Sequence, residues 1–228
     1  MNQIKPRHEL KYNISLSDAL ALKARLKAIT HADPHGGAIN SYKIRSLYFD
    51  NLQDKALMEK INGVNNREKF RLRYYNNDPS FIKLEKKSKR NGLCYKEFTL
   101  ITKEECEKLL QGDYSFLKNQ NNRLFTEFYA KIRNYQLRAK TIVDYLREPY
   151  IYKAGNVRIT LDSHITTGLF STDFFKSDIP TINHSYSDVI ILEVKYDEFL
   201  PGIIQDLIQL NNRQSSAFSK YAACRIYG

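Results

Sequence analysis

The chain has 228 residues, 42% of them hydrophobic, and 36 lysines and arginines outnumber 25 aspartates and glutamates, for a formal net charge of +11. This length suits one large globular domain over residues 1–228, which buries roughly 70% of the surface that the unfolded chain exposes. The charge predicts an anionic partner, such as nucleic acid, an anionic membrane surface or a small polyanion.

Cysteine usage and hydropathy exclude several classes of protein. Cys94, Cys106 and Cys224 lack CxxC and Cys/His finger spacing, which argues against a disulfide framework and a zinc site. The N-terminal sequence has no apolar signal region, and no window contains the ~20 apolar residues of a transmembrane helix. We therefore expect a soluble cytoplasmic protein with reduced cysteines, which associates with a membrane only through a partner.

The first elements of the chain are a strand and a helix. Arg7–Asn13 is predicted as a strand, and Ser15 or Ser17 can cap a helix over Asp18–Ile29. The segment His31–Asn40 contains proline and two glycines and is predicted as a loop. The proline lies between His31 and His35, so their i,i+4 spacing does not predict a helical metal site.

Residues 41–110 are predicted to contain four strands and two helices. In chain order these are the strand Ser41–Asp50, the helix Leu52–Ile61, the strands Arg67–Tyr75, Phe81–Lys87 and Leu93–Ile101, and the helix Lys103–Leu110. The turn formers of Asn76–Ser80 and the dipeptide Asn91-Gly92 predict hairpins between the last three strands. Thr102 is expected to cap the second helix, with two glutamates in its first turn.

The second half of the chain is predicted to contain a long helix, a hairpin and a final strand and helix. These are the amphipathic helix Asn119–Leu137, the hairpin Lys140–Tyr152 and Asn156–Asp162, the strand Asp188–Asp197 and the helix Pro201–Leu210. The aromatic residues of the long helix recur at helical spacing, which favours core packing over base stacking. The polar segment His164–Ser187 is predicted as an irregular excursion.

Charged residues alternate along several predicted strands. Because alternate strand residues face opposite sides of a sheet, each of these strands has one charged face. The faces are Arg7, Glu9 and Lys11; Arg67, Lys69, Arg71 and Arg73; Phe81, Lys83, Glu85, Lys87 and Lys89; and Glu193 with Lys195. One such strand could be a solvated face of an antiparallel sheet, but the recurrence predicts a sheet curled around a charged interior. The apolar faces are then expected to meet helices near Leu20 and Phe128.

Nine short motifs occur in one order along nearly the whole chain. They are RHELKY, SLYFDN, FRLRYY, LEKKSK, YKEF, LREPYIY, VRITLD, ILEVKYDEF and AFSKY. Together they resemble the triphosphate tunnel metalloenzymes and, more closely, the catalytic domain of the vacuolar transporter chaperone (VTC) polyphosphate polymerases and their bacterial relatives. The resemblance implies an α+β fold, an antiparallel β-barrel with flanking helices. Its inner wall would present cations to polyphosphate, with Mn²⁺ or Mg²⁺ as cofactor.

The resemblance also implies functional residues. The implied catalytic cations are Lys11, Arg71, Arg73, Arg158 and Lys195, and the implied phosphate-binding residues are Lys60, Lys83, Lys87, Lys96, Arg147 and Lys220. Glu193 would be the chief metal ligand, with Glu85 and Glu9 as further ligands, although Glu85 lies between lysines and suits a counter-charge equally well. The sequence departs from the family in two places. Arg7 replaces the first carboxylate of the tunnel ExExK motif, as in polymerase-type members, and Lys60 stands where the family has arginine.

Three functions follow as hypotheses. The leading one is a polymerase-type phosphotransferase that moves the terminal phosphate of a nucleoside triphosphate onto a polyphosphate chain. The second is a tripolyphosphatase or nucleoside triphosphatase on the same fold, which needs a further carboxylate or base to activate water, and Arg7 favours the polymerase over it. The third is a non-catalytic module for polyphosphate or RNA, with an exposed basic groove near Tyr74, Tyr75 and Tyr95. We expect no nucleic-acid partner, and the sequence does not predict the oligomeric state.

Overall fold

The computed structural model describes residues 6–33, 40–118, 121–183, 189–210 and 213–225. Its strands are β1 His8–Ile14, β2 His31–Ala32, β3 Tyr42–Asp50, β4 Arg67–Tyr75, β5 Asp78–Arg90, β6 Leu93–Ile101, β7 Arg138–Tyr152, β8 Val157–Thr167, β9 Ile182–Asn183 and β10 Ile190–Tyr196. Its helices are α1 Leu16–Ile29, α2 Lys55–Ile61, α3 Lys103–Leu110, α4 Ser115–Lys118, α5 Arg123–Tyr135, α6 Gly202–Ile208 and α7 Lys220–Cys224, with a 3₁₀ turn, η2, at Ala154–Asn156.

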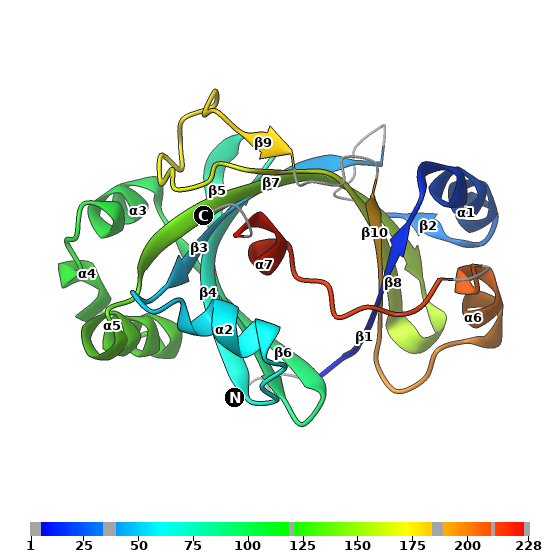
Figure 1. Cartoon of the computed structure of the whole chain (residues 1–228), viewed down its shortest axis with the longest axis horizontal. Helices are drawn as coiled ribbons and strands as arrows, with labels where there is room; N and C mark the ends of the chain where they lie inside the picture. Colours follow the sequence, from blue (N-terminus) through cyan, green and yellow to red (C-terminus); the bar gives the residue numbers. More distant parts are fainter. Residues whose placement is uncertain (1–5, 34–39, 119–120, 184–188, 211–212, 226–228) are drawn as a thin grey trace.

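The strands form one antiparallel sheet that curls into a half-barrel (Figure 1). The order across the sheet is β1-β10-β8-β7-β3-β4-β5-β6, with β2 added to β7 and β9 added to β8. The edge strands β1 and β6 approach each other at a bridge where the Arg7 amide donates to the Cys94 carbonyl oxygen over 3.2 Å. The curled antiparallel sheet and its helices confirm the predicted fold class.

Two tight turns set the register of β4, β5 and β6. Asn76 and Asn77 have φ angles of 51° and 58°, and Asn91 and Gly92 have φ angles of 49° and 82°. Two successive residues with positive φ make the two-residue hairpin turn whose twist matches that of the strands. The first turn therefore needs only two residues, and β5 begins at Asp78 rather than at the predicted Phe81.

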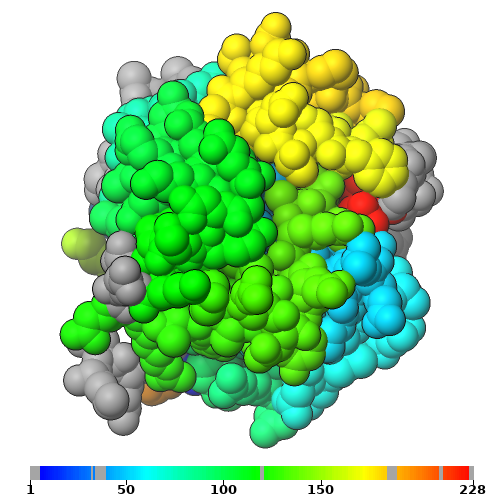
Figure 2. All heavy atoms as spheres, turned by 90° about the vertical axis from the view of Figure 1, so that its left-hand side faces the viewer, coloured from blue at the N-terminus to red at the C-terminus, as the bar shows by residue number. Residues whose placement is uncertain are grey.

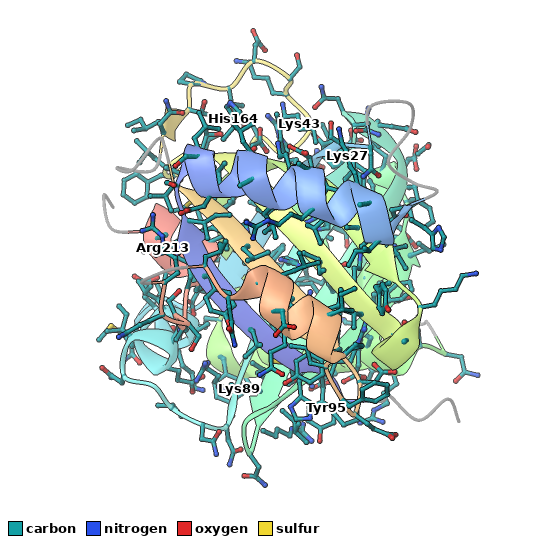
Figure 3. All side chains as sticks on the ribbon, turned by 90° about the vertical axis from the view of Figure 1, so that its right-hand side faces the viewer. Lys27, Lys43, Lys89, Tyr95, His164 and Arg213 are labelled. Atoms are coloured by element: carbon teal, nitrogen blue, oxygen red, sulfur yellow. The ribbon has the colours of Figure 1, made fainter. Side chains whose placement is uncertain are left out.

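The convex face of the sheet is apolar and covered by helices, as the alternation predicts. On one side α1 and α6 cross β1, β10 and β8, and their core includes Leu22, Leu192 and Ile159 (Figure 3). On the other side α3, α4 and α5 form the outer surface (Figure 2). They pack on β4, β5 and β6, where Phe128 is fully buried. Leu20, in contrast, is 58% exposed. The helix meets the sheet where expected, but Leu20 lies two residues from Leu22 and therefore on the opposite side of α1.

Some boundaries differ from the predictions because local caps and pairings override the hydrophobic pattern. The expected helix Asn119–Leu137 begins later, since the Asn122 side chain accepts from the Leu124 and Phe125 amides and caps α5. Strand β8 continues beyond Asp162 to Thr167, with a register shift in its pairing with β7, so the excursion is shorter than expected. His31 pairs in β2 instead of lying in a loop. Residues 34–39, which include His35, lie outside the described residues.

The short helix α7, which the sequence pattern did not predict, lies inside the curve of the sheet (Figure 1). Its Tyr221 and Cys224 belong to a buried cluster with Tyr48 and Tyr145 on the concave face. Part of the barrel interior is thus an apolar core, and the charged surface occupies the rest. No helix within the described ranges is long and apolar enough to span a membrane.

Candidate active site

A large basic cavity fills the open part of the concave face. It has about 1,400 Å³ of empty space, part of it open to solvent. Among the described residues, eleven lysines and arginines line it, against the two carboxylates of Glu9 and Glu193. The lining cations are Arg7, Lys11, Lys69, Arg71, Arg73, Lys87, Lys96, Arg147, Arg158, Lys195 and Lys220. Such an excess of positive charge in a concave, partly desolvated surface creates a strong attractive potential for an anion.

Strand pairing brings the cations of separate segments into rows across the sheet. Arg71 pairs with Glu85, and Lys69 pairs with Lys87, which in turn pairs with Lys96. Paired residues of neighbouring antiparallel strands point to the same face. The hairpins β4–β5 and β5–β6 therefore place one wall of the cavity, and β8, β10 and β1 place the opposite wall.

Glu85 is buried in the first wall and holds three cations together. Its carboxylate oxygens lie 2.6 Å from Arg71 Nη2 and 2.5 Å from Lys96 Nζ, and Arg73 Nη1 lies 3.9 Å away. Burial raises the pKa of the Glu85 carboxyl, but Arg71, Arg73 and Lys96 outweigh it and hold the pKa well below its usual range. Glu85 is thus an ionised counter-charge that keeps neighbouring cations from repelling one another.

The second wall carries a pair of carboxylates among lysines. In the β1–β10 ladder Glu9 pairs with Lys195 and Lys11 pairs with Glu193, so acidic and basic side chains alternate along and across the two strands. Lys11 and Lys87 lie 2.9 Å and 2.7 Å from Glu9. Burial and Glu193 raise the pKa of Glu9, but Lys87, Lys11 and Lys195 lower it to about 2. The pKa of Glu193 is held well below its usual range by Lys195, Lys11 and Lys87 against the effect of burial. Both carboxylates are therefore ionised at neutral pH.

Asp162 anchors two further cations at the back of the cavity. The Arg147 guanidinium donates to both Asp162 oxygens, over 2.6 and 2.7 Å, and Lys220 Nζ lies 2.5 Å from the same carboxylate. Asp162 has no solvent exposure. Because Lys220 is the first residue of α7, this contact fixes the helix on the concave face and directs its ammonium group to the cavity.

The donor set of the second wall fits a divalent metal. Mg²⁺ and similar hard cations are commonly bound by one or two carboxylates together with the phosphates of a substrate. Glu9 and Glu193 offer two ionised carboxylates side by side at the cavity surface. Glu85 is a poorer donor, because its side chain is buried behind the lining, whereas Glu9 and Glu193 are part of the cavity surface. Within the described ranges no cluster of three or more histidine, cysteine, aspartate or glutamate side chains is formed.

Lys96 and Lys69, which line the cavity, have lowered pKa values. Desolvation of its ammonium group lowers the pKa of Lys96 to about 7, with Arg73 and Arg71 acting in the same direction and Glu85 opposing them, although 46% of the whole side chain is exposed. Burial, Lys87, Lys11 and Arg71 hold the pKa of Lys69 well below its ordinary value. Both lowered pKa values indicate that the positive charges around Lys96 and Lys69 are crowded and only partly neutralised. A bound polyanion would relieve that crowding.

Most of the predicted site residues are brought together by the fold. Those that line the cavity are Lys11, Arg71, Arg73, Lys87, Lys96, Arg147, Arg158, Lys195, Lys220, Glu9 and Glu193. Lys60 lies in an adjoining pocket that shares Lys11, Lys69 and Lys87 with the cavity. Glu85 is buried behind the lining, and Lys83 lies against aromatic rings further along β5.

Other residues of the cavity were not among the predicted site residues. Lys69 and Arg7 both line it, and their places on the charged faces of β4 and at the start of β1 could have identified them. The sequence did not predict the roles of Tyr48 and Tyr145 as acceptors: Arg71 Nη1 donates to Tyr48 Oη over 2.8 Å, and Arg73 Nη2 donates to Tyr145 Oη over 2.8 Å. No sequence signal separates these two tyrosines from the other fourteen of the chain.

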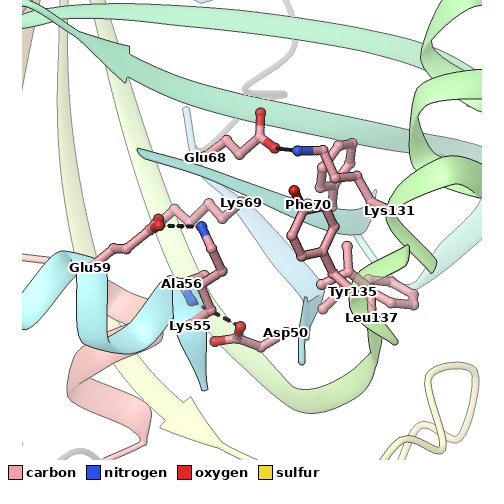
Figure 4. Close-up of a pocket in the computed structure, with 11 residues that line it drawn as sticks. Asp50, Lys55, Ala56, Glu59, Glu68, Lys69, Phe70, Lys131, Tyr135 and Leu137 are labelled. Atoms are coloured by element: carbon pink, nitrogen blue, oxygen red, sulfur yellow. Dashed lines mark hydrogen bonds and ion pairs between the residues drawn. The ribbon is translucent and has the colours of Figure 1, made fainter. Parts of the chain in front are cut away.

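A smaller pocket outside the barrel differs from the cavity in its charge balance (Figure 4). It lies between α2, β4 and α5, with Phe70, Tyr135 and Leu137 in its wall. Its lining carries three lysines, Lys55, Lys69 and Lys131, and three carboxylates, Asp50, Glu59 and Glu68. Lys55 pairs with Glu59, and Lys131 lies 2.5 Å from Glu68. This neutral lining makes the pocket a poor site for a polyanion, unlike the cavity.

Comparison with known families gives a match over almost the whole chain. The family model described as the VTC domain matches residues 6–226. No curated protein matches the sequence.

Solved structures match the same extent of the chain at low sequence identity. A Hippeastrum protein, provisionally named an adenylyl cyclase and described as having a dominant triphosphatase activity, is 14% identical with a TM-score of 0.56, over 96% of this chain and 94% of that chain. A Bacillus halodurans protein, provisionally named an adenylate cyclase, is 13% identical with a TM-score of 0.54, over 90% of this chain and 89% of its own. At such identities the likeness shows a shared fold.

Proposed function

The chain belongs to the VTC domain family, and from this premise we propose that it is a polyphosphate polymerase-type phosphotransferase. In this proposal it transfers the terminal phosphate of a nucleoside triphosphate to the end of an inorganic polyphosphate chain. The solved structures that resemble it share the predicted triphosphate tunnel fold, and one of them is described as having triphosphatase activity.

The observation that carries the proposal is the charge of the cavity. Eleven cationic side chains face two carboxylates in one concave surface. A single small anion would neutralise only a few of them. A polyphosphate carries about one negative charge per phosphate, so an extended chain can engage cations on both walls at once. Charge-assisted hydrogen bonds to phosphate are also roughly twice as strong as neutral ones.

The residues of the first wall suit the transfer step. Phosphoryl transfer passes through a loose transition state, so catalysis consists mainly of positioning and charge stabilisation. Arg71 and Arg73 are each held by a tyrosine hydroxyl, and both lie beside the same carboxylate of Glu85. Their guanidinium groups are fixed in direction and share one counter-charge, which leaves positive charge for the transferring phosphoryl group. The attacking polyphosphate end is already an oxyanion and needs no general base.

The second wall would hold the metal. Glu9 and Glu193 are the proposed ligands for Mn²⁺ or Mg²⁺, and a bound divalent ion supplies further neutralisation of phosphate charge. Lys11, Lys87 and Lys195 surround these carboxylates and keep them ionised. The same three lysines lie next to any phosphate that binds at Glu9 and Glu193. Phosphate binding and metal binding therefore depend on one cluster of side chains.

Arg7 favours a polymerase over a hydrolase in this proposal. It lines the cavity beside the carboxylate pair and lies 2.9 Å from Asp197. A carboxylate at this position could take part in activating water, whereas a guanidinium instead binds phosphate. We therefore propose a polyphosphate end, rather than water, as the acceptor of the phosphoryl group.

The cytoplasmic location of the protein remains a prediction.

The test is a product assay with purified protein, ATP and Mn²⁺. Polyphosphate of increasing length, resolved on a gel, supports the proposal. Orthophosphate as the sole product assigns a triphosphatase instead. Tight binding of tripolyphosphate without any product assigns a binding module. Assays that replace Mn²⁺ with Mg²⁺ or with a chelator identify the metal requirement.

A further inference from the structure

Exposed apolar side chains continue the inner face of β5 and β6 beyond the cavity. Phe81, Phe98 and Leu100 have exposed fractions of 46%, 54% and 52%. They share the face of the sheet that carries Lys96 and Lys87, because residues two apart on a strand point the same way. Large apolar side chains that remain exposed next to a charged cavity suggest a ligand that is partly aromatic and partly anionic.

Lys83 lies at the centre of this group. Its ammonium nitrogen is 4.7 Å from the ring centroid of Phe98, 4.8 Å from that of Phe81 and 5.6 Å from that of Tyr75. In the strand register Lys83 pairs with Arg73 on one side and Leu100 on the other. It thus lies between the phosphate-binding wall and the exposed rings.

We propose that Phe81 and Phe98, here called the aromatic platform, bind the base of a nucleoside triphosphate whose phosphates lie in the basic cavity, and that Lys83 between the two rings binds its phosphates. This inference rests on the proposed function and adds to it a subsite that distinguishes nucleotides from inorganic polyphosphate. Aromatic side chains bind bases by stacking, largely irrespective of base identity. The platform therefore provides affinity for any nucleoside triphosphate.

The position of the platform matches the shape of a nucleotide. Phe98 follows Lys96 by two residues on one strand face, a step of about 7 Å, and the Lys96 ammonium lies 5.9 Å from the Phe98 ring centroid. Lys96 in turn contacts Glu85 beside Arg71. A base on the platform thus places the phosphates that follow it next to these cations.

Lys83 is the residue that would change partners on binding. A cation over a ring at an exposed site is held more weakly than a charge-assisted hydrogen bond to phosphate. When a nucleotide arrives, the flexible Lys83 side chain can move from the rings to the phosphate nearest the ribose. The rings are then free to stack on the base. Inorganic polyphosphate has no base and leaves this contact unused.

The experiment compares ATP and inorganic tripolyphosphate by isothermal titration calorimetry without divalent metal. The variants are Phe98→Ala and, as a matched control, Phe199→Ala, which removes a phenylalanine of similar exposure, 58%, near α6. Phe98→Ala should weaken ATP binding about ten-fold, the usual effect of losing one stacked base, and leave tripolyphosphate binding unchanged. Phe98→Trp should restore ATP affinity. Phe199→Ala should change neither.

Two results overturn the inference: unchanged ATP affinity in Phe98→Ala, or an equal loss of affinity for ATP and tripolyphosphate. If ATP affinity is unchanged and Phe98→Ala also sediments differently from the wild type, the exposed rings belong to a contact between protein chains. The proposed function is tested separately, by the products that the wild-type protein makes from ATP with Mn²⁺, so its failure is distinguishable from either binding result.

Discussion

The ammonium nitrogen of Lys96 lies 2.5 Å from the Glu85 carboxylate, yet the pKa of Lys96 is lowered to about 7. Burial and the guanidinium groups of Arg73 and Arg71 outweigh the one carboxylate that these three cations share. The wall therefore carries more positive charge than it can stabilise by itself. Three of the following predictions depend on that imbalance.

Binding of phosphate at this wall should take up protons above neutral pH. At pH 8 the empty site holds Lys96 largely neutral, and an adjacent phosphate raises its pKa and restores the charge. Below about pH 6 Lys96 is already protonated, so no uptake is expected from it. Calorimetric titration of tripolyphosphate in two buffers of different ionisation enthalpy measures the uptake. Lys96→Arg, which stays charged, should reduce it, and equal uptake in both proteins would assign it to other lysines such as Lys69.

Polyphosphate should stabilise the folded protein. The cations of the cavity repel one another when it is empty, and a ligand that binds only the folded state adds about 2.7 kcal/mol at 100 times its Kd. The melting temperature should therefore rise with tripolyphosphate at low ionic strength. The rise should shrink in 1 M salt, where the Debye length is about 3 Å. An unchanged melting temperature at low salt would contradict the cavity as the binding site.

Loss of Glu85 should destabilise the fold rather than remove a metal. Glu85→Gln leaves Arg71, Arg73 and Lys96 together without a counter-charge, and breaking a buried ion pair in this way costs about 3–5 kcal/mol. Urea denaturation measures the loss, with the fully exposed Glu104→Gln as control. Tripolyphosphate should restore much of the stability of Glu85→Gln. If stability is unchanged and metal dependence is lost, Glu85 is a ligand instead.

Substitutions of two residues on β10, Glu193 and Lys195, should separate ligand binding from catalysis. Glu193→Gln keeps the shape of the side chain but removes the negative charge that a hard divalent metal requires. It should abolish turnover and leave tripolyphosphate affinity equal or higher. Lys195→Ala should weaken binding and turnover together, by about 1.5–3 kcal/mol for a charged hydrogen bond. If Glu193→Gln keeps full metal-dependent activity, Glu9 rather than Glu193 is the metal ligand.

The local pattern of the sequence determined the strands and the direction in which their side chains point. Arg67–Tyr75 was predicted with its observed bounds, and its alternation correctly separated Arg71 from Leu72, one in the cavity and one in the outer core. Asn91-Gly92 likewise predicted its hairpin. These features depend on a period of two and on turn residues that tolerate positive φ, both of which are local properties.

Only the tertiary structure decided where along each strand the basic surface ends. Lys83 and Lys87 occupy the same face of β5, yet Lys87 lines the cavity and Lys83 lies among exposed rings. That difference depends on how β1 approaches β6 and on where α7 fills the barrel. The pairing of Asp162 with Lys220 joins segments 58 residues apart in sequence. Periodicity carries no information on such distances, because the curl of the whole sheet determines which charges meet.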